Sequence, residues 1–213
     1  MTTVGLLLAA GAGRRMGGPK ALVRPDPRGP TLLEIAVSRL RAAGLGRVVV
    51  VVGAAADRVA PIAAAAGADV VVAHDWDQGM GASLRAGLER VTATEPEAHA
   101  VLVTLVDLPD VGPEVHRRVL SHTGPEPAGA LVRATDDGRP GHPVLLGRDH
   151  WPAVVDGAHG DRGARRHLAT HPTTEVDCAD LATGRDADTP ADLGGGGTTG
   201  AEPADGRSDR MEP

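Results

Sequence analysis

Aromatic side chains are almost absent from this sequence. Among its 213 residues there is no Phe and no Tyr, and the only Trp residues are Trp76 and Trp151. Ala, Val and Leu therefore supply nearly all of the 41% hydrophobic share. Small side chains of this kind pack well in a parallel sheet covered by Ala-rich helices, so the composition favours an α/β protein.

Cysteine is also scarce. Cys178 is the only one, which excludes an intrachain disulfide and a zinc site built from cysteines. The N-terminus lacks the basic segment and cleavage site of a signal peptide, and no apolar run approaches the length of a membrane span. These absences predict a cytoplasmic protein without a membrane partner.

Positive charge is neither abundant nor clustered. The chain has 22 Lys and Arg against 28 Asp and Glu, a formal net charge of −6. No run of basic residues is longer than a pair. Proteins that bind nucleic acid usually carry a basic stripe, often with aromatic platforms for bases. We therefore expect no nucleic acid partner.

Short apolar runs alternate with longer amphipathic segments along residues 1–193. Continuous apolar runs are typical of strands buried on both faces. The alternation predicts a single domain with a doubly wound, mostly parallel sheet and helices on both faces. Strands are expected at 4–10, 47–52, 69–73, 100–106, 128–132 and 143–146, and helices at 31–43, 57–66, 80–91, 113–121 and 162–169.

Residues 194–213 differ from the rest of the chain. They begin with four glycines and continue with Thr, Asp, Glu and Pro, with almost nothing to bury. Such a segment cannot offset the entropy lost on ordering, so we expect a disordered tail.

A glycine-rich loop follows the first expected strand. Residues 6–20 read LLLAAGAGRRMGGPK, with four glycines, two arginines and Lys20. Glycines let backbone N–H groups approach a polyphosphate, and basic side chains neutralise it. The spacing differs from a P-loop and from the dinucleotide-binding fingerprint, and no acidic residue ends the second strand. The alternative is a flexible connection with solvated charges.

Carboxylates stand at two positions suited to a metal ion. Asp107 directly follows a buried strand, although it could instead cap the turn before Pro109. Asp186 and Asp188 alternate in an extended stretch, so both could reach one ion. Thr189 with Pro190 equally suits a helix start. Mg²⁺ typically takes one or two carboxylates together with phosphate oxygens and water.

The loop motif L-A-A-G-x-G-x-R-M-G-x-P-K resembles the signature of the MobA-like NTP transferases, and within them most closely the molybdenum cofactor cytidylyltransferases. The resemblance implies that the loop holds the triphosphate of CTP. The nucleotide contacts would come from Leu8, Ala9, Ala10, Gly11 and Gly13. Arg15 and Lys20 would act as catalytic cations, with Lys20 near the α-phosphate. Asp107, in a D-x-P motif, would act with them and bind Mg²⁺, joined by Asp188 and Asp186 from a D-x-D-T-P-x-D-L ending.

Three further motifs extend the resemblance over roughly residues 3–193. The stretch 76–88 resembles W-x-x-G-x-x-x-S-L-x-x-G-L, implying nucleotide contacts from Gly79 and Ser83, although plain helix capping is the alternative. Relatives often have Asn where Ala73 stands, so that contact is not carried over. The stretches 138–146 and 160–166 resemble G-x-P-G-H-P-V and G-D-x-G-A-R. They imply contacts to a phosphorylated acceptor from His142, Asp161 and Arg165, although each could be structural.

The family resemblance implies Mg²⁺-dependent transfer of CMP from CTP to the phosphate of molybdopterin, with release of pyrophosphate. The product could then pass to a molybdenum hydroxylase. Related chains act as guanylyltransferases on molybdopterin or on small phosphorylated acids. Some proteins of this group are nicotine blue oxidoreductases, which implies an NAD(P)H-dependent alternative. A third alternative is a regulatory nucleotide-binding protein, although Lys20 and Asp107 argue for catalysis.

Overall fold

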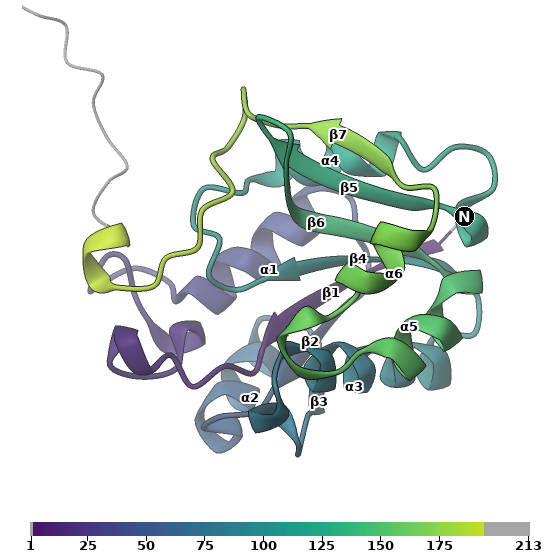
Figure 1. Cartoon of the computed structure of the whole chain (residues 1–213). Coiled ribbons are helices and arrows are strands. Elements are labelled where there is room, and N and C mark those ends of the chain that lie inside the picture. The colour runs from purple at the N-terminus through teal and green to yellow at the C-terminus, as the bar shows by residue number, and fades with distance from the viewer. Residues whose placement is uncertain (1, 194–213) are drawn as a thin grey trace, which may run out of the picture.

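The computed structural model describes residues 2–193 and forms one seven-stranded sheet with helices on both faces (Figure 1). The strand order is β3-β2-β1-β4-β6-β5-β7. No helix in this part of the chain is both long and apolar enough to cross a membrane. The strands are β1 (Thr2–Ala9), β2 (Val48–Val52), β3 (Asp69–Val72), β4 (Ala98–Leu105), β5 (Leu131–Asp136), β6 (Arg139–Gly147) and β7 (Thr174–Asp177).

The first half of the sheet is parallel, as the apolar runs predicted. β1 pairs in parallel with β2 and β4, and β2 with β3. β2 consists of five valines, all of them buried. β-branched residues favour extended backbone, and burial on both faces removes the need for polar positions. The carboxyl ends of β1 and β4 therefore meet at one edge of the sheet.

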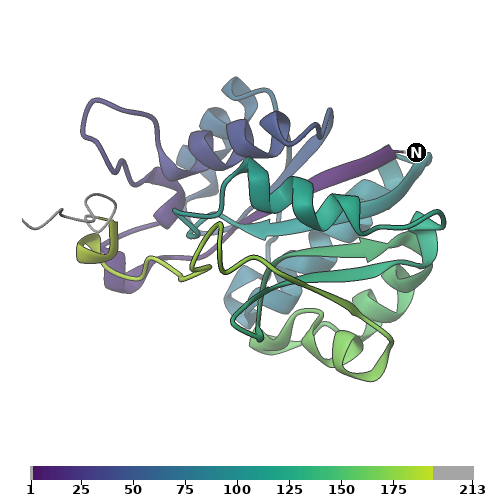
Figure 2. The same cartoon turned by 90° about the horizontal axis from the view of Figure 1, so that it is seen from above.

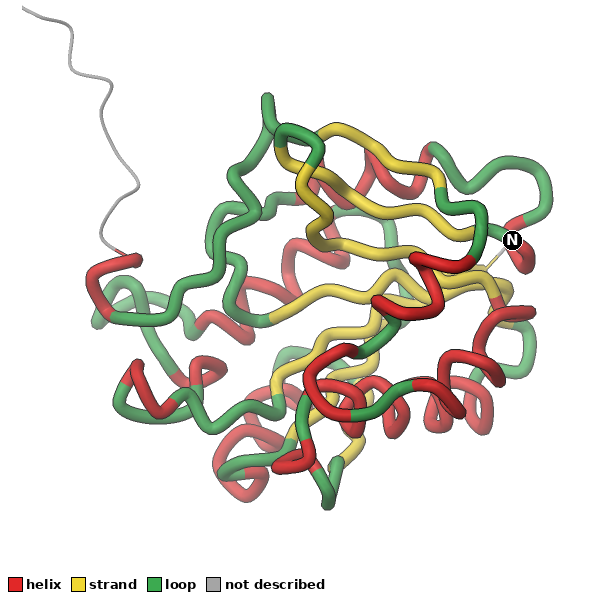
Figure 3. Tube along the Cα trace, viewed as in Figure 1, coloured by secondary structure: helices red, strands yellow, loops and turns green. Residues whose placement is uncertain are grey.

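Helices cover both faces of the sheet (Figures 2 and 3). A hydrophobic cluster lies on each face. One contains residues of α1, α2 and α4, and the other contains residues of α3, α5 and α6. The helices are α1 (Leu32–Ala42), α2 (Ala56–Ala65), α3 (Met80–Thr94), α4 (Pro113–Ser121), α5 (Trp151–Gly157) and α6 (Arg165–Thr170).

The first helix begins where the sequence favours it. The Thr31 hydroxyl accepts a hydrogen bond from the Glu34 backbone N–H, and the Glu34 carboxylate accepts one from the Thr31 backbone N–H. This capping box satisfies two N–H groups that a helix start leaves open. It fixes the point at which α1 begins.

The second half of the sheet is mixed. β6 runs antiparallel to both β4 and β5, and β7 is parallel to β5. β5 and β6 form a hairpin whose two turn residues, Asp137 and Gly138, both have positive φ. Such two-residue turns match the twist of a hairpin. β6 and β5 thereby continue the sheet beside the carboxyl end of β4.

Several element boundaries differ from expectation. The strand expected at 128–132 begins at Leu131, because Pro127–Gly129 forms a 3-10 turn, and it continues to Asp136. The helix expected from residue 162 begins at Arg165, because a 3-10 turn ends at Gly163 with φ of 48°. α5 and β7 were not predicted, since both are short and lack a clear apolar period. The predicted tail 194–213 lies outside the described residues.

Candidate active site

The glycine-rich loop leaves the carboxyl end of β1 and turns back on itself. The Gly18 backbone N–H donates to the Gly13 carbonyl oxygen at 3.1 Å. Gly13 has φ of 58°, and a Cβ atom built there would overlap the Gly18 carbonyl oxygen. Only glycine fits such a position. The loop then forms two short 3-10 turns, Arg14–Met16 and Lys20–Leu22, which present Arg15 and Lys20.

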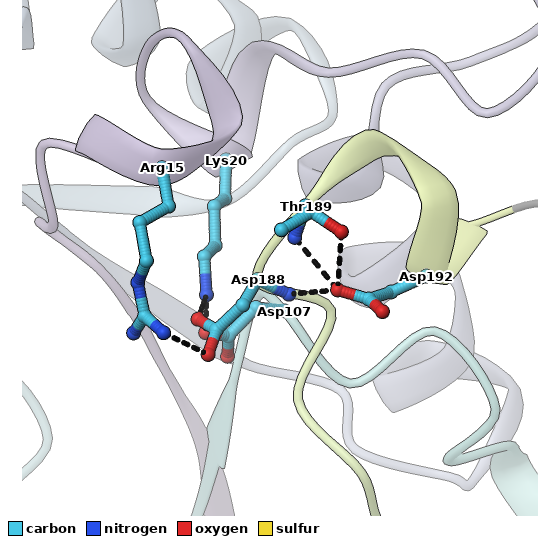
Figure 4. A network of polar contacts seen from close by, with 6 residues as sticks. All are labelled: Arg15, Lys20, Asp107, Asp188, Thr189 and Asp192. Atoms are coloured by element: carbon cyan, nitrogen blue, oxygen red, sulfur yellow. Dashed lines mark hydrogen bonds and ion pairs between the residues drawn. The ribbon is translucent and has the colours of Figure 1, made fainter.

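Lys20 lies between two carboxylates (Figure 4). Its Nζ donates to Oδ2 of Asp107 at 2.7 Å and to Oδ1 of Asp188 at 2.8 Å. Asp107 follows β4, and Asp188 comes from the C-terminal end of the described chain. Arg15 Nη1 lies 2.9 Å from Oδ2 of Asp188. Three segments far apart in the sequence thus meet around one ammonium group.

The charges in this cluster stabilise one another. Burial alone would lower the pKa of Lys20, but its hydrogen bonds to Asp107 and Asp188 outweigh burial and raise that pKa. The hydrogen bond from Lys20 lowers the pKa of Asp188. The ammonium and the Asp188 carboxylate therefore both stay charged at neutral pH. Arg15 is 74% exposed, so its ion pair with Asp188 adds little stability.

Backbone contacts hold Asp188 in place. The Ala187 N–H donates to the Asp107 carbonyl oxygen at 2.8 Å. One carboxylate oxygen of Asp192 accepts from the backbone N–H of Asp188 and from both the N–H and the hydroxyl of Thr189 (Figure 4). The sequence suggested Thr189 as the cap of a helix start. A 3-10 helix does begin at Pro190, directly after Thr189. The side chain that accepts hydrogen bonds there is Asp192, at the end of the D-T-P-x-D motif.

A cavity of about 570 Å³, here called the glycine-loop cavity, opens beside this cluster. Arg15, Lys20, Asp107 and Asp188 line one part of it, and Trp76 lines another. Most residues predicted to contact the nucleotide also line this cavity: Leu8, Ala10, Gly11, Gly13, Gly79 and Ser83.

Two predicted residues occupy other places than expected. Ala9 is buried in the core cluster on the α1 face and is not among the residues that line the cavity. Asp161, expected to contact the acceptor, lines the glycine-loop cavity. The reason is that the turn Gly160–Arg162 packs closely against Gly79, which lines the same cavity. A Cβ atom added to Gly79 would lie 2.6 Å from Asp161 Oδ1.

A second cavity of about 320 Å³ adjoins the first, and both are lined by Leu8, Met80 and Leu105. Two residues predicted for the acceptor, His142 and Arg165, line it. Burial is the main cause that lowers the pKa of His142 to about 4. The positive charge of Arg165 lowers this pKa further, whereas the Asp107 carboxylate raises it. His142 is therefore a neutral hydrogen-bonding group at neutral pH.

Asp186 lines the second cavity and has no direct contact with Lys20. Partial burial and the nearby Asp107 carboxylate raise the pKa of Asp186. Although Asp186 and Asp188 alternate in sequence, the structure directs them to different cavities. A role for Asp186 as a metal ligand stays a prediction.

The carboxylates fit a divalent cation. Asp107 and Asp188 already bind one positively charged group from two sides. Within residues 2–193 no cluster of three or more His, Cys, Asp or Glu residues suits a metal. Mg²⁺ commonly needs only one or two carboxylates when phosphate oxygens and water complete its shell. The donor set therefore suits a metal that arrives with a nucleotide.

Sequence patterns missed two residues of this region. Asp192 was part of a quoted motif, and its position three residues after Thr189 was the available signal. Arg133, which lines the second cavity, stands in no motif and sits in a strand whose boundaries were misplaced. No sequence signal marked it.

A mixed sheet with a phosphate-type loop at β1 and carboxylates at β4 defines a nucleotidyltransferase-type protein. The chain belongs to the MobA-like NTP transferase family, because the model of the MobA-like NTP transferase domain matches residues 5–176. This confirms the family and the fold class expected from the motifs.

Individual proteins similar to this chain carry different names. The chain is 40% identical over 192 residues to nicotine blue oxidoreductase of Paenarthrobacter nicotinovorans, covering 87% of this chain and 91% of that protein. Its fold resembles the crystal structure of Rv0371c from Mycobacterium tuberculosis, with a TM-score of 0.73, 31% identity and coverage of 90% and 95% of the two chains.

A further structure of Rv0371c is a complex with manganese, with a TM-score of 0.67, 30% identity and coverage of 84% and 89%. A nucleotidyl transferase from Methanothermobacter shares the fold with a TM-score of 0.74 at 20% identity, over 90% of this chain and 94% of that one.

Proposed function

We propose that this protein transfers CMP from CTP to the terminal phosphate of a molybdopterin-type acceptor, releases pyrophosphate, and requires Mg²⁺. The observation that carries the proposal is the Lys20 ammonium held at 2.7 and 2.8 Å by Asp107 and Asp188 beside the glycine loop. The geometry provides both a cation for phosphates and carboxylates for a metal. The L-A-A-G form of the loop supports CTP.

The loop side of the site binds and orients the triphosphate. Gly11 has open space where a side chain would stand, and Gly13 lets the loop fold back closely on Gly18, so phosphate oxygens could approach backbone N–H groups of the loop. Arg15 and Lys20 neutralise the charge that builds up at the α-phosphate, which is the main task of a protein in such transfers. Trp76 and Ser83 line the same cavity, and we expect them to contact the nucleoside.

Asp107 and Asp188 are the residues that would hold the metal. A bound Mg²⁺ would neutralise phosphate oxygens and align the leaving group. Manganese in the complex of Rv0371c supports a divalent cation in this family. The pKa of Asp188 is lowered, so its carboxylate is ready for a cation without first losing a proton.

The acceptor side needs to position its ligand and does not need to activate it. A phosphomonoester is already a nucleophile near neutral pH, so no general base is required. His142 is neutral there and can donate or accept a hydrogen bond. Arg165 supplies positive charge at the same cavity. We expect this activity in the cytoplasm, with hand-over of the product to a molybdenum hydroxylase.

The test is pyrophosphate release with each of the four nucleoside triphosphates, with and without Mg²⁺, using molybdopterin as acceptor. The proposal expects release with CTP that depends on both Mg²⁺ and acceptor. Preference for GTP would instead support the guanylyltransferase alternative. No release with any nucleotide would refute the transfer reaction.

A second candidate function is NAD(P)H-dependent reduction, favoured by the 40% identity to nicotine blue oxidoreductase. Two features argue for the transferase. The loop spacing departs from the dinucleotide fingerprint, and Gly53 directly follows β2, where such proteins place a ribose-binding acid. An NADH-oxidation assay with nicotine blue, run beside the pyrophosphate assay, distinguishes the two functions. NADH consumption without pyrophosphate would favour the reductase.

A further inference from the structure

An arginine lies in the wall of the second cavity, on the face of the sheet that α6 covers. Arg133 is on β5, and its side chain is only 14% exposed. Its neighbours in the sheet are Val144 on β6 and Glu175 on β7. Val144 lines the same cavity and belongs to the hydrophobic cluster of that face. A full positive charge in such surroundings needs partners.

The guanidinium of Arg133 is incompletely paired. Its Nη2 donates to Oε1 of Glu175. Its Nε is buried and has no hydrogen-bond partner among residues 2–193. The Glu175 side chain is 50% exposed, so water competes with Arg133 for hydrogen bonds to this carboxylate. Burying an incompletely paired charge is costly, and the negative charge of a ligand in the adjoining cavity would reduce that cost.

The rest of the cavity is also positively charged. Arg162 and Arg165 are exposed at its rim, whereas Asp186 is the only carboxylate among its described lining residues. His142 adds no charge at neutral pH, because its pKa is about 4. Even with Glu175 counted beside Asp186, the three arginines leave an excess of positive charge, which favours an anionic ligand.

This cavity continues from the site of transfer. It shares Leu8, Met80 and Leu105 with the glycine-loop cavity. His142 lines the second cavity, and the charges of both Asp107 and Arg165 affect its pKa. An acceptor whose phosphate lies near Lys20 therefore extends past His142 towards Arg133.

We propose that the second cavity selects acceptors with a second anionic group at the end remote from the reacting phosphate, and that Arg133 is the specificity-determining residue for that group. The inference rests on the proposed function, because it takes the phosphate of the acceptor to lie at Lys20. A guanidinium suits this task, since its planar fork matches a carboxylate or a phosphate.

The experiment uses two sets of matched ligands with the full-length protein. The short set is glycerol 3-phosphate, 3-phosphoglycerate and glycerol 1,3-bisphosphate. The long set is glucitol 6-phosphate, 6-phosphogluconate and glucitol 1,6-bisphosphate. Within each set only the remote group changes, from hydroxyl to carboxylate to phosphate. Dissociation constants are measured by calorimetry in the presence of Mg²⁺ and CTP.

We expect at least one set to show roughly 10- to 100-fold tighter binding of an anionic member than of the alcohol, the range for a hydrogen bond to a charged group. The preferred member distinguishes a carboxylate from a phosphate, and the preferred set shows the separation of the two subsites. Equal binding of alcohol and anionic ligands in both sets would overturn the proposal.

Two variants must change the preference in opposite directions. Arg133→Met removes the cation and abolishes the preference, whereas Glu175→Gln removes a competing carboxylate and increases it. Arg47→Met is the matched control, because Arg47 also pairs with a glutamate, Glu95, and lines neither the glycine-loop cavity nor the second cavity. A preference that persists in Arg133→Met would show that the Arg133–Glu175 pair is only structural.

Arg133→Lys keeps the proposal testable if the methionine variant does not fold. It retains the charge without the fork and should reduce the preference. Failure of the two proposals can be told apart. Anion preference without pyrophosphate release would refute the transfer reaction alone, and release of pyrophosphate without anion preference would refute the role of Arg133 alone.

Discussion

Replacing Asp107 with asparagine separates the fold of this protein from its proposed chemistry. The amide would keep the shape of the side chain but remove a charge that binds Lys20 at 2.7 Å. The Lys20 and Asp107 side chains are 15% and 19% exposed, so the pair is largely buried. Leaving a buried charge unpaired costs roughly 3–5 kcal/mol. Because Lys20 keeps Asp188 as a partner, we expect a loss of only about 2 kcal/mol.

The effect on turnover should be larger than the effect on stability. Asp107 is one of two carboxylates that suit the metal, and metal stabilisation of the transferred phosphate is worth several kcal/mol. We therefore expect pyrophosphate release to fall by at least about a thousandfold, equivalent to roughly 4 kcal/mol. Urea unfolding measures the first effect and a coupled pyrophosphate assay measures the second.

The control for this variant is Asp180→Asn. Asp180 is also paired with an arginine, Arg118, but its side chain is 63% exposed. It lines neither the glycine-loop cavity nor the second cavity. Because the pair is exposed to solvent, its loss should change stability little and leave turnover unchanged. Turnover close to that of the wild type in Asp107→Asn would refute the assignment of the site. So would equal effects of the two variants on turnover.

Three other predictions concern folding and binding. Burial lowers the pKa of His116 to about 4 from the usual 6.5, so the folded state resists its protonation. The free energy of unfolding is therefore not reduced by His116 above pH 6.5, and it falls by about 3 kcal/mol as the pH drops from 6.5 to 4. Urea titrations at several pH values should find a smaller loss in His116→Leu. Gly13→Ala forces a Cβ atom onto the Gly18 carbonyl oxygen, so calorimetry should show at least tenfold weaker CTP binding; unchanged affinity would contradict the loop geometry. Trp76 lines the glycine-loop cavity while Trp151 is buried and donates to a backbone carbonyl, so CTP should change the emission of the wild type but not of Trp76→Leu.

The sequence by itself determined the layered α/β fold, and its motifs marked most of the segments that line the glycine-loop cavity. The valines of β2 and the apolar run of β1 specify buried parallel strands, since little else can be placed between two layers of helices. Gly13 follows from local geometry, because its backbone conformation and its close contact with Gly18 exclude any side chain. These features are encoded by neighbouring residues and so appear as patterns.

Only the tertiary structure decided which charged groups meet. Asp188 binds Lys20 across 168 positions of sequence, and its partner Asp192 became apparent only in the folded chain. Asp186 is two residues away and lines a different cavity. The position of Arg133 beside that cavity depends on a hairpin that makes β6 antiparallel. Contacts of this kind depend on strand order and on where loops pack, which no local pattern encodes.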